Sequence, residues 1–248
     1  MQDPKYSEPR ARRLALVTGG NKGIGREVVR QLAAAGLRVW LAARDPAKGE
    51  AAAVEFRQQG HDVQFIRLDV NDASSIAFAV ASVGSRSERL DVLVNNAGIL
   101  DAADGPPSIV DVEVVRRTLD TNFFGPLQVT RAFLPLLRRS PAASIVNVSS
   151  GLGSISLNAD PDWEFARFKL TGYNTSKAAL NLLTVMLAAE LRETAIVVNA
   201  VSPEYTATDL NGFRGTHSVE EGAAEAVRLA LNAEVRGAFL QSGGRLPW

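Results

Sequence analysis

The sequence of 248 residues contains no cysteine and only two histidines, His61 and His217. Without cysteine the chain has neither a disulfide framework nor a metal site built on thiolates. Two histidines so far apart in the sequence do not indicate a metal cluster, and we expect no metal. Any chemistry that moves protons must therefore use other side chains.

An excess of one charge is also missing, since Lys plus Arg and Asp plus Glu number 27 each and the formal net charge is zero. No overall field then attracts nucleic acid or an anionic membrane, and we expect neither as a partner. No apolar run reaches the length of about 18 residues that a membrane span requires. Residues 1–13 lack the apolar core of a signal peptide. These absences predict a cytoplasmic protein.

The sequence does contain an alternation of apolar runs, which suit buried strands, with segments of helical spacing. Hydrophobic residues make up 46% of the chain, enough for one large core. The alternation predicts an α/β fold, a Rossmann-type doubly wound parallel sheet of about seven strands with helices on both faces. The expected strands are 14–17, 37–43, 62–68, 91–94, 144–148, 195–201 and 237–241. The expected helices are 26–35, 46–59, 72–86, 108–138, 178–192 and 219–231.

Residues 18–25, with the sequence TGGNKGIG, lie between the first expected strand and the first expected helix. Glycines in such a turn let backbone N–H groups approach a pyrophosphate, and the positive end of the helix faces its charge. The spacing G-x-x-x-G-x-G therefore indicates a dinucleotide site. Glycine clusters also make ordinary turns, so this stretch alone leaves both interpretations open.

Arg44 directly follows the second expected strand, near the place where NAD enzymes of this architecture carry an acid for the ribose 2′-hydroxyl. Ala43 stands at that place instead, and Lys22 adds a second cation in the glycine turn. Because arginine pairs with phosphate, these residues favour NADP(H). The alternatives are that both cations are plain surface charges, or that Asp45 supplies the acid.

Further candidate binding residues follow the later expected strands. Asp69 and Val70 come after the third strand and NNAG, at 95–98, after the fourth, at the edge where open α/β sheets bind ligands. Gly and Pro at 122–126 weaken the helix over 108–138 and free carbonyls that can hold water. Tyr173 and Lys177 are four residues apart at the opening of the next helix, so one helix face carries both.

Taken in order, the segments TGGNKGIG, NNAG, TNFFG, NVSSGLG, YNTSK and NAVSPEYTATDL resemble the short-chain dehydrogenase/reductase family over nearly the whole chain after residue 12. The Asn-Lys pair in the glycine turn, AARD after the second strand, and TNFFG look most like its NADPH-dependent carbonyl reductase group. The family motif places a glycine three residues after the catalytic serine, and Gly153 meets this for Ser150 but not for Ser149. The resemblance implies a catalytic set of Asn122, Ser150, Tyr173 and Lys177.

The activity that the resemblance implies is reversible, NADPH-dependent reduction of a ketone or aldehyde to an alcohol. Tyr173 would donate the proton, with its pKa lowered by Lys177. Ser150 would hold the carbonyl oxygen, and Asn122 would support a water that leads from Lys177 to solvent. The expected partner is a small carbonyl or alcohol substrate. A steroid, sugar or 3-oxoacyl reductase and a non-catalytic NADP-binding regulator remain open.

The resemblance also implies a domain plan, with a flexible tail over residues 1–12 and a single dinucleotide-binding catalytic domain over 13–248. Substrate loops are expected around 151–170 and 202–218. The residues expected to bind NADP(H) are Gly19, Asn21, Lys22, Gly23, Ile24, Gly25, Arg44, Asp69, Val70, Asn96, Ala97, Gly98, Tyr173, Lys177, Pro203, Thr206 and Thr208.

Three features depart from the family pattern. Ser150 and Tyr173 are 23 positions apart, more than in compact family members, so an insertion lies beside the pocket. Pro203-Glu204 stands where family members commonly have Pro-Gly, so Glu204 replaces a glycine. We expect its carboxylate either to disfavour anionic and favour cationic substrates, or to face solvent without effect. Residues 243–248 differ from the usual short tail, so the sequence leaves open whether the protein is a monomer or a homo-oligomer.

Overall fold

The computed structural model describes residues 12–232 and 234–248. Residues 1–11, which include most of the expected flexible tail, lie outside the described residues. Within the described ranges, no helix combines the length and the apolar character needed to cross a membrane.

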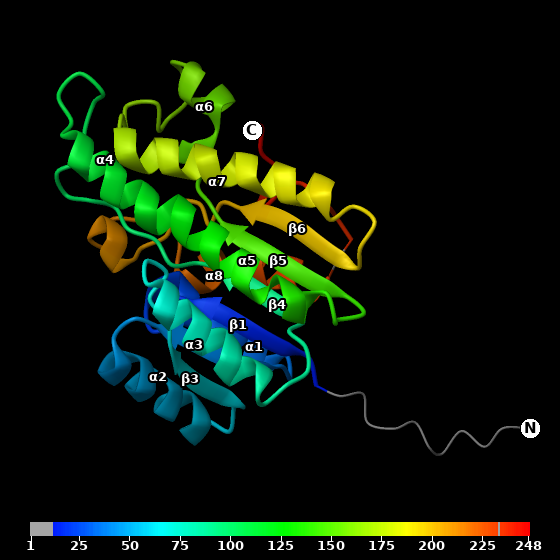
Figure 1. The fold of residues 1–248 in the computed structure, drawn as a ribbon. Helices are drawn as coiled ribbons and strands as arrows, with labels where there is room; N and C mark the ends of the chain where they lie inside the picture. Colours follow the sequence, from blue (N-terminus) through cyan, green and yellow to red (C-terminus); the bar gives the residue numbers. More distant parts are fainter. Residues whose placement is uncertain (1–11, 233) are drawn as a thin grey trace, which may run out of the picture.

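One sheet of eight strands forms the centre of the molecule, in the order β3-β2-β1-β4-β5-β6-β7-β8 (Figure 1). The strands are β1 (Leu14–Thr18), β2 (Arg38–Ala43), β3 (Val63–Arg67), β4 (Val92–Asn95), β5 (Ala143–Val148), β6 (Ile196–Val201), β7 (Phe239–Gln241) and β8 (Gly244–Arg245). Neighbouring strands pair in parallel except β7 and β8, which pair antiparallel. The expected Rossmann-type sheet is confirmed. The eighth strand, β8, was not predicted, because a strand of two residues is too short to show an apolar pattern.

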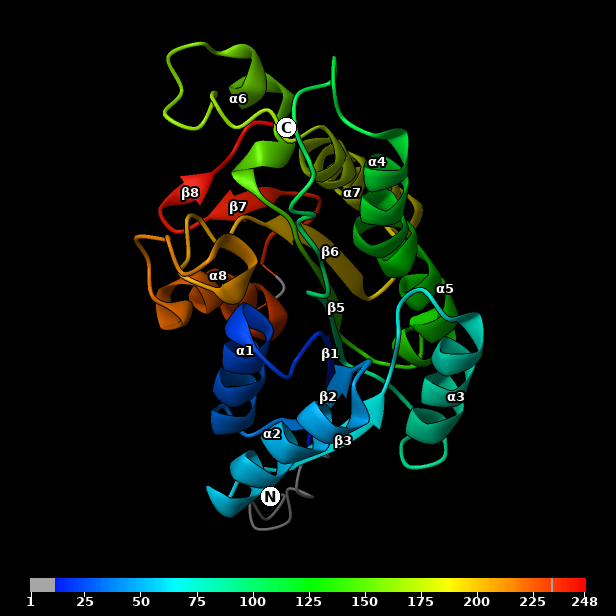
Figure 2. The ribbon, with the colours of Figure 1, turned by 90° about the vertical axis from the view of Figure 1, so that its left-hand side faces the viewer.

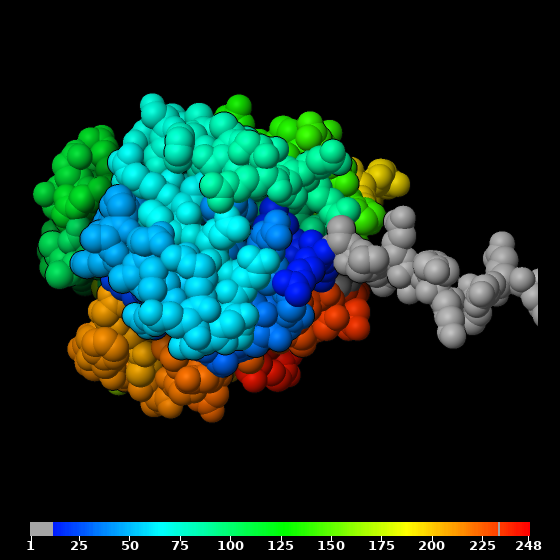
Figure 3. All heavy atoms as spheres, turned by 90° about the horizontal axis from the view of Figure 1, so that it is seen from below, coloured from blue at the N-terminus to red at the C-terminus, as the bar shows by residue number. Residues whose placement is uncertain are grey.

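Helices cover both faces of the sheet. They are α1 (Gly23–Ala34), α2 (Pro46–Gln58), α3 (Ala73–Gly84), α4 (Val112–Leu119), α5 (Gly125–Leu137), α6 (Ile155–Ala159), α7 (Thr171–Glu190) and α8 (Val219–Leu231). Figure 2 shows α1, α2 and α8 on one side of the strands and α3, α5 and α7 on the other. Seen from below, the surface is formed largely by the N-terminal half of the chain, coloured blue to teal (Figure 3).

The apolar strands are continuous because both faces are buried. In β1, Ala15 and Val17 pack in the core beneath α1, α2 and α8, whereas Leu14 and Leu16 pack in the core beneath α3, α5 and α7. All four side chains are at most 3% exposed. Successive side chains of a strand point to opposite faces, so a strand covered on both sides needs no polar residue.

The expected helix over 108–138 differs from the observed structure in one respect. It begins at Val112 rather than near Ser108, because the carboxylate of Asp111 accepts a hydrogen bond from the Glu113 N–H, at 2.9 Å, and caps the first turn. The expected interruption is present. A π-helical turn, η1 (Asp120–Phe124), separates α4 from α5.

Two glycines provide a matched test of this packing. A Cβ on Gly25 would collide with the Gly19 carbonyl oxygen and the Asn96 amide, whereas a Cβ on Gly84 would meet no atom within 4 Å. We expect Gly25→Ala to lower the free energy of unfolding by about 1–3 kcal/mol. Gly84→Ala should raise it by about 0.5–1 kcal/mol, because a helical alanine loses less chain entropy. Urea denaturation measures both, and equal effects would contradict the packing described.

Candidate active site

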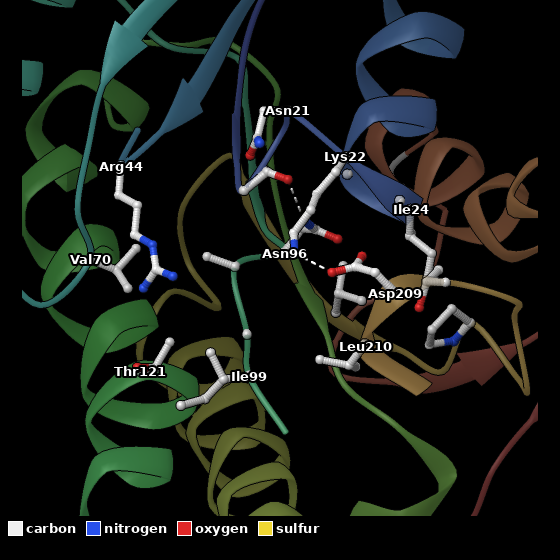
Figure 4. A pocket seen from close by; sticks show the side chains of 18 of the residues that line it. Asn21, Lys22, Ile24, Arg44, Val70, Asn96, Ile99, Thr121, Asp209 and Leu210 are labelled. Atoms are coloured by element: carbon white, nitrogen blue, oxygen red, sulfur yellow. Dashed lines mark hydrogen bonds and ion pairs between the residues drawn. The ribbon is translucent and has the colours of Figure 1, made fainter. Parts of the chain in front are cut away.

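A cavity of about 220 Å³ lies at the carboxyl edge of the sheet (Figure 4). Its walls come from the ends of β1 to β6 and the segments that follow them, from η1 and from the start of α7. β1 lies between β2 and β4, so the chain connections diverge there and leave a crevice. The described structure thus brings together segments that are far apart in the sequence.

Nearly all residues expected to bind a dinucleotide line this cavity. They are Gly19, Asn21, Lys22, Gly23, Ile24, Gly25, Arg44, Asp69, Val70, Asn96, Ala97, Gly98, Tyr173, Lys177, Pro203 and Thr208. Thr206 does not line it. Its buried hydroxyl donates to the Pro203 carbonyl at 2.5 Å, and it packs against Gly222. Thr206 therefore shapes the loop beneath the cavity wall.

Sequence reasoning missed several other lining residues, namely Leu68, Asn71, Ile99, Thr121, Val148, Ser149, Asp209 and Leu210. Asp209 matters most because its carboxylate forms an ion pair with the Lys22 ammonium across the cavity (Figure 4). The two residues are far apart in the sequence, and no motif pairs them.

Hydrogen bonds from the segment after β4 hold the glycine turn in place. The Asn96 side-chain amide donates to the carbonyls of Thr18 and Gly19, at 2.9 and 3.2 Å. The Thr18 hydroxyl accepts from the backbone N–H groups of Asn96 and Ala97, each at 3.0 Å. Gly19 itself has a φ of +64°, which glycine adopts without strain. The Asn96 amide therefore fixes the shape of the turn.

The start of α1 fits a phosphate-bearing dinucleotide. No side chain caps this helix and no acidic residue lies in its first turn, so its first N–H groups are open to an anion. Arg44 extends into the cavity from the end of β2 (Figure 4). The Asp45 carboxylate is used elsewhere, because it accepts from the Lys48 N–H at 3.1 Å and caps α2. This donor set fits a phosphate better than a ribose hydroxyl.

Tyr173 and Lys177 both lie on α7 and face the same cavity. The Lys177 ammonium donates to the Val148 carbonyl at 2.8 Å and lies 5.7 Å from the centre of the Tyr173 ring. Burial lowers the pKa of Lys177 to about 8. Burial raises the pKa of Tyr173 to about 12, and a hydrogen bond with Ser150 opposes part of that rise. The expected lowering of the Tyr173 pKa is therefore wrong for the protein without a dinucleotide.

Ser150, rather than Ser149, lies beside the phenol. The Ser149 hydroxyl donates to the Asn181 side chain at 2.6 Å inside the protein. Gly153 explains why this loop can lie so close to α7, since a Cβ there would be 2.7 Å from the Lys177 carbonyl carbon. These contacts place the serine, but its catalytic role stays a prediction.

Asn122 lies within η1 and is fully buried. Its side-chain oxygen accepts from the Ile99 N–H at 2.8 Å, and its NH₂ donates to the Ile99 carbonyl and to the Ser176 hydroxyl, at 2.9 and 3.0 Å. A Cβ on Gly98 would lie 3.3 Å from the Asn122 oxygen and 3.6 Å from the Lys177 nitrogen. Asn122 thus reaches the surroundings of Lys177, while its amide braces the segment after β4.

Asp104 is a positioning residue that sequence reasoning missed. Its carboxylate accepts from the backbone N–H groups of Gly172 and Tyr173, at 3.0 and 2.8 Å. It therefore caps the N-terminus of α7 from a distant loop and fixes the position of the Tyr173 backbone. An aspartate in a loop before Gly-Pro-Pro gives no sequence signal for such a contact.

A second cavity, of about 540 Å³, lies beside the first. Ser149 and Pro203 line the first cavity, and their chain neighbours Ser150 and Glu204 line the second. The two cavities therefore adjoin. The insertion over 151–170 forms part of its wall and contains α6 and the 3₁₀ turn η2 (Gly151–Gly153). Its size suits a small organic molecule next to the Ser150 hydroxyl.

Comparisons with known proteins agree with this geometry. A family model described as short chain dehydrogenase matches residues 13–218. The chain is 35% identical over 274 residues to (+)-neomenthol dehydrogenase of Arabidopsis thaliana, covering 88% of this chain and 91% of the relative. It is 34% identical over 255 residues to carbonyl reductase (NADPH) 1 of Homo sapiens, covering 88% of this chain and 90% of the relative. The structure is similar to that of NADPH-bound carbonyl reductase from chicken fatty liver, with a TM-score of 0.84 and 32% identity. The match covers 96% of this chain and 99% of the other chain.

The raised pKa of Tyr173 gives a measurable titration. In the protein without a dinucleotide, we expect Tyr173 to stay protonated at pH about 10.5, where a solvated phenol is more than half ionised. Near-ultraviolet absorbance of phenolate should then be the same in the wild type and in Tyr173→Phe. Near-ultraviolet circular dichroism at the same pH verifies that both remain folded. An extra phenolate in the wild type at about pH 10.5 would contradict the raised pKa of Tyr173.

Proposed function

Because this chain belongs to the short-chain dehydrogenase family, we propose that it is an NADPH-dependent carbonyl reductase that reduces a ketone or aldehyde to an alcohol. In reverse it oxidises the alcohol. One observation carries the proposal, namely that Ser150, Tyr173 and Lys177 meet where a cation-bearing cavity adjoins a larger, partly apolar one. The names of the human and chicken relatives support the same reaction class.

The cofactor preference follows from charge at the end of β2. Arg44 brings a guanidinium into the cavity, and guanidinium pairs with the 2′-phosphate of NADPH by two hydrogen bonds. Ala43 has no carboxylate for a ribose hydroxyl, and the Asp45 carboxylate caps α2. Lys22 is the second cation, although Asp209 balances its charge in this structure. Arg44 is therefore the main determinant of the preference.

Each residue of the site has a separate role in reducing the carbonyl group. When bound, the reduced nicotinamide supplies a hydride to the carbonyl carbon. Tyr173 donates its phenolic proton to the carbonyl oxygen, which takes up the electron pair of the broken π bond. The Ser150 hydroxyl donates a hydrogen bond to that oxygen, and the bond strengthens as negative charge develops. A pKa of about 12 keeps Tyr173 protonated at neutral pH, which suits an acid.

Lys177 restores the proton that Tyr173 gives up. With its pKa lowered to about 8, the ammonium releases and regains a proton near neutral pH more readily than a solvated lysine. An ammonium this near the phenol also stabilises the phenolate that forms. We further propose that a water held near Asn122 and Gly98 connects Lys177 to solvent, since a Cβ on Gly98 would lie close to both the Asn122 oxygen and the Lys177 nitrogen.

The preference for NADPH is tested at Arg44. We expect Arg44→Ala to weaken NADPH binding about tenfold to a hundredfold, because it removes a charge-assisted contact with the 2′-phosphate. NADH binding should change little. Calorimetric titration of both cofactors measures this, with the exposed Arg138→Ala as a matched loss of charge away from the cavity. Equal affinities of the wild type for NADPH and NADH would refute the preference.

The proton donor is tested at Tyr173. We expect Tyr173→Phe to reduce turnover of a ketone by at least about a hundredfold, because it removes the acid and keeps the ring. NADPH affinity should stay close to that of the wild type. Steady-state oxidation of NADPH gives the rate, and a cofactor titration gives the affinity.

Two serines serve as a matched control for the same reaction. Ser150→Ala should also reduce turnover strongly, since it removes the hydrogen bond to the carbonyl oxygen. Ser149→Ala should mainly lower stability, because its hydroxyl bonds Asn181 inside the protein. Substantial turnover by Tyr173→Phe at neutral pH would show that another group supplies the proton.

A further inference from the structure

The larger cavity has an aromatic wall beside the reacting group. Trp163 and Phe165 come from the insertion, and Tyr205 comes from the loop 202–218. The Phe165 ring centre lies 5.5 Å from that of Trp163 and 5.8 Å from that of Tyr205. Ser150 lines the same cavity. A molecule whose carbonyl oxygen lies on Ser150 would therefore place its remaining frame against three aromatic rings.

The charged side chains of this cavity are mainly acidic. Among the described residues, no lysine or arginine lines it, whereas the carboxylates of Glu164 and Glu204 and the imidazole of His217 do. Glu204 lies 3.4 Å from the His217 ring nitrogen, and its side chain is only 24% exposed. The lining residues Glu164 and Glu204 carry two negative charges, and His217 carries at most one positive charge, so the net charge of the lining is negative in either protonation state of His217.

Glu204 is held in place by its backbone. Its φ of 59° lies in the left-handed region, which a residue with a Cβ adopts only where its surroundings fix it. The Ser202 hydroxyl accepts from the Glu204 N–H at 3.4 Å and from the Gly151 N–H at 3.0 Å. One hydroxyl therefore ties Glu204 to the loop that begins at Ser150.

On the basis of the proposed function, we propose that the substrate is a ketone or aldehyde that carries a cationic ammonium group on an apolar frame, and that Glu204 selects for it. The carboxylate attracts the ammonium, and the faces of aromatic rings attract it further. An anionic substrate such as a keto acid is repelled by the same charge and finds no lysine or arginine among the described lining residues.

Two ketones of equal shape test the proposal, namely 4-acetyl-N,N,N-trimethylanilinium and 4-tert-butylacetophenone, which differ in charge alone. A third, 4-acetylbenzoate, is the anionic member. Calorimetry gives the dissociation constant of each ketone with enzyme saturated by NADP⁺, which permits no reduction. Initial rates with NADPH give kcat/KM for each ketone.

We expect the wild type to prefer the cation over the neutral ketone by about fivefold to tenfold in both measurements, since a partly exposed charge acts weakly. Glu204→Gln and Glu204→Gly should both bring this ratio close to one. Glu193→Gln removes an equal charge from the exposed turn between α7 and β6, at the opposite end of β6 from Glu204, and should leave the ratio unchanged.

Three outcomes would overturn the proposal. The first is equal or weaker binding of the cation in the wild type, and the second is a ratio that survives Glu204→Gln. The third is a change in Glu204→Gly alone, which would assign the effect to the backbone. If no ketone is reduced but the binding ratio holds, the proposed reaction fails and the charge selectivity stands.

Discussion

The close approach of the loop after β5 to the backbone of α7 is the constraint on which the site depends. Gly153 lies directly against Lys177, and no larger residue fits there without moving the helix. This contact sets the distance between Ser150, which begins the loop, and Tyr173 and Lys177, which lie on the helix. Asp104 fixes the start of the same helix through two backbone N–H groups. The side chains of Ser150, Tyr173 and Lys177 are thus placed by backbone packing, and their own hydrogen bonds refine a geometry that is already set.

Burial shifts the two titrating groups of α7 in opposite senses, because low polarity favours the neutral form of each. It raises the pKa of Tyr173 to about 12 and lowers that of Lys177 to about 8, so the two values, which lie close together in water, move apart. The nearby Val148 carbonyl stabilises the ammonium and limits its loss. Burial therefore makes a stronger acid of the lysine and a weaker acid of the tyrosine before any cofactor contributes its charge.

Sequence patterns predicted the elements well because buried parallel strands carry continuous apolar runs. They also predicted the residues that line the first cavity, since these follow strand ends and the glycine turn. What they missed depends on contacts between distant segments. The pairs Lys22–Asp209 and Asp104–Tyr173 join residues with no fixed spacing. Thr206 does not line the first cavity because its hydroxyl donates to the Pro203 carbonyl. The raised pKa of Tyr173 required knowledge of its burial, which a spacing of four residues does not contain.

The strand order has a consequence for how the protein matures. β1 is the first strand to be synthesised but lies between β2 and β4, and the Ser149 N–H bonds the Val201 carbonyl, at 2.7 Å, where β5 and β6 pair. The larger cavity also needs His217 and Leu246. Contacts of such long sequence separation form slowly, since distant segments lose much chain entropy when they meet. A nascent chain on the ribosome therefore carries the residues of its glycine turn long before it can complete the larger cavity, and the whole site is among the last parts of the structure to form.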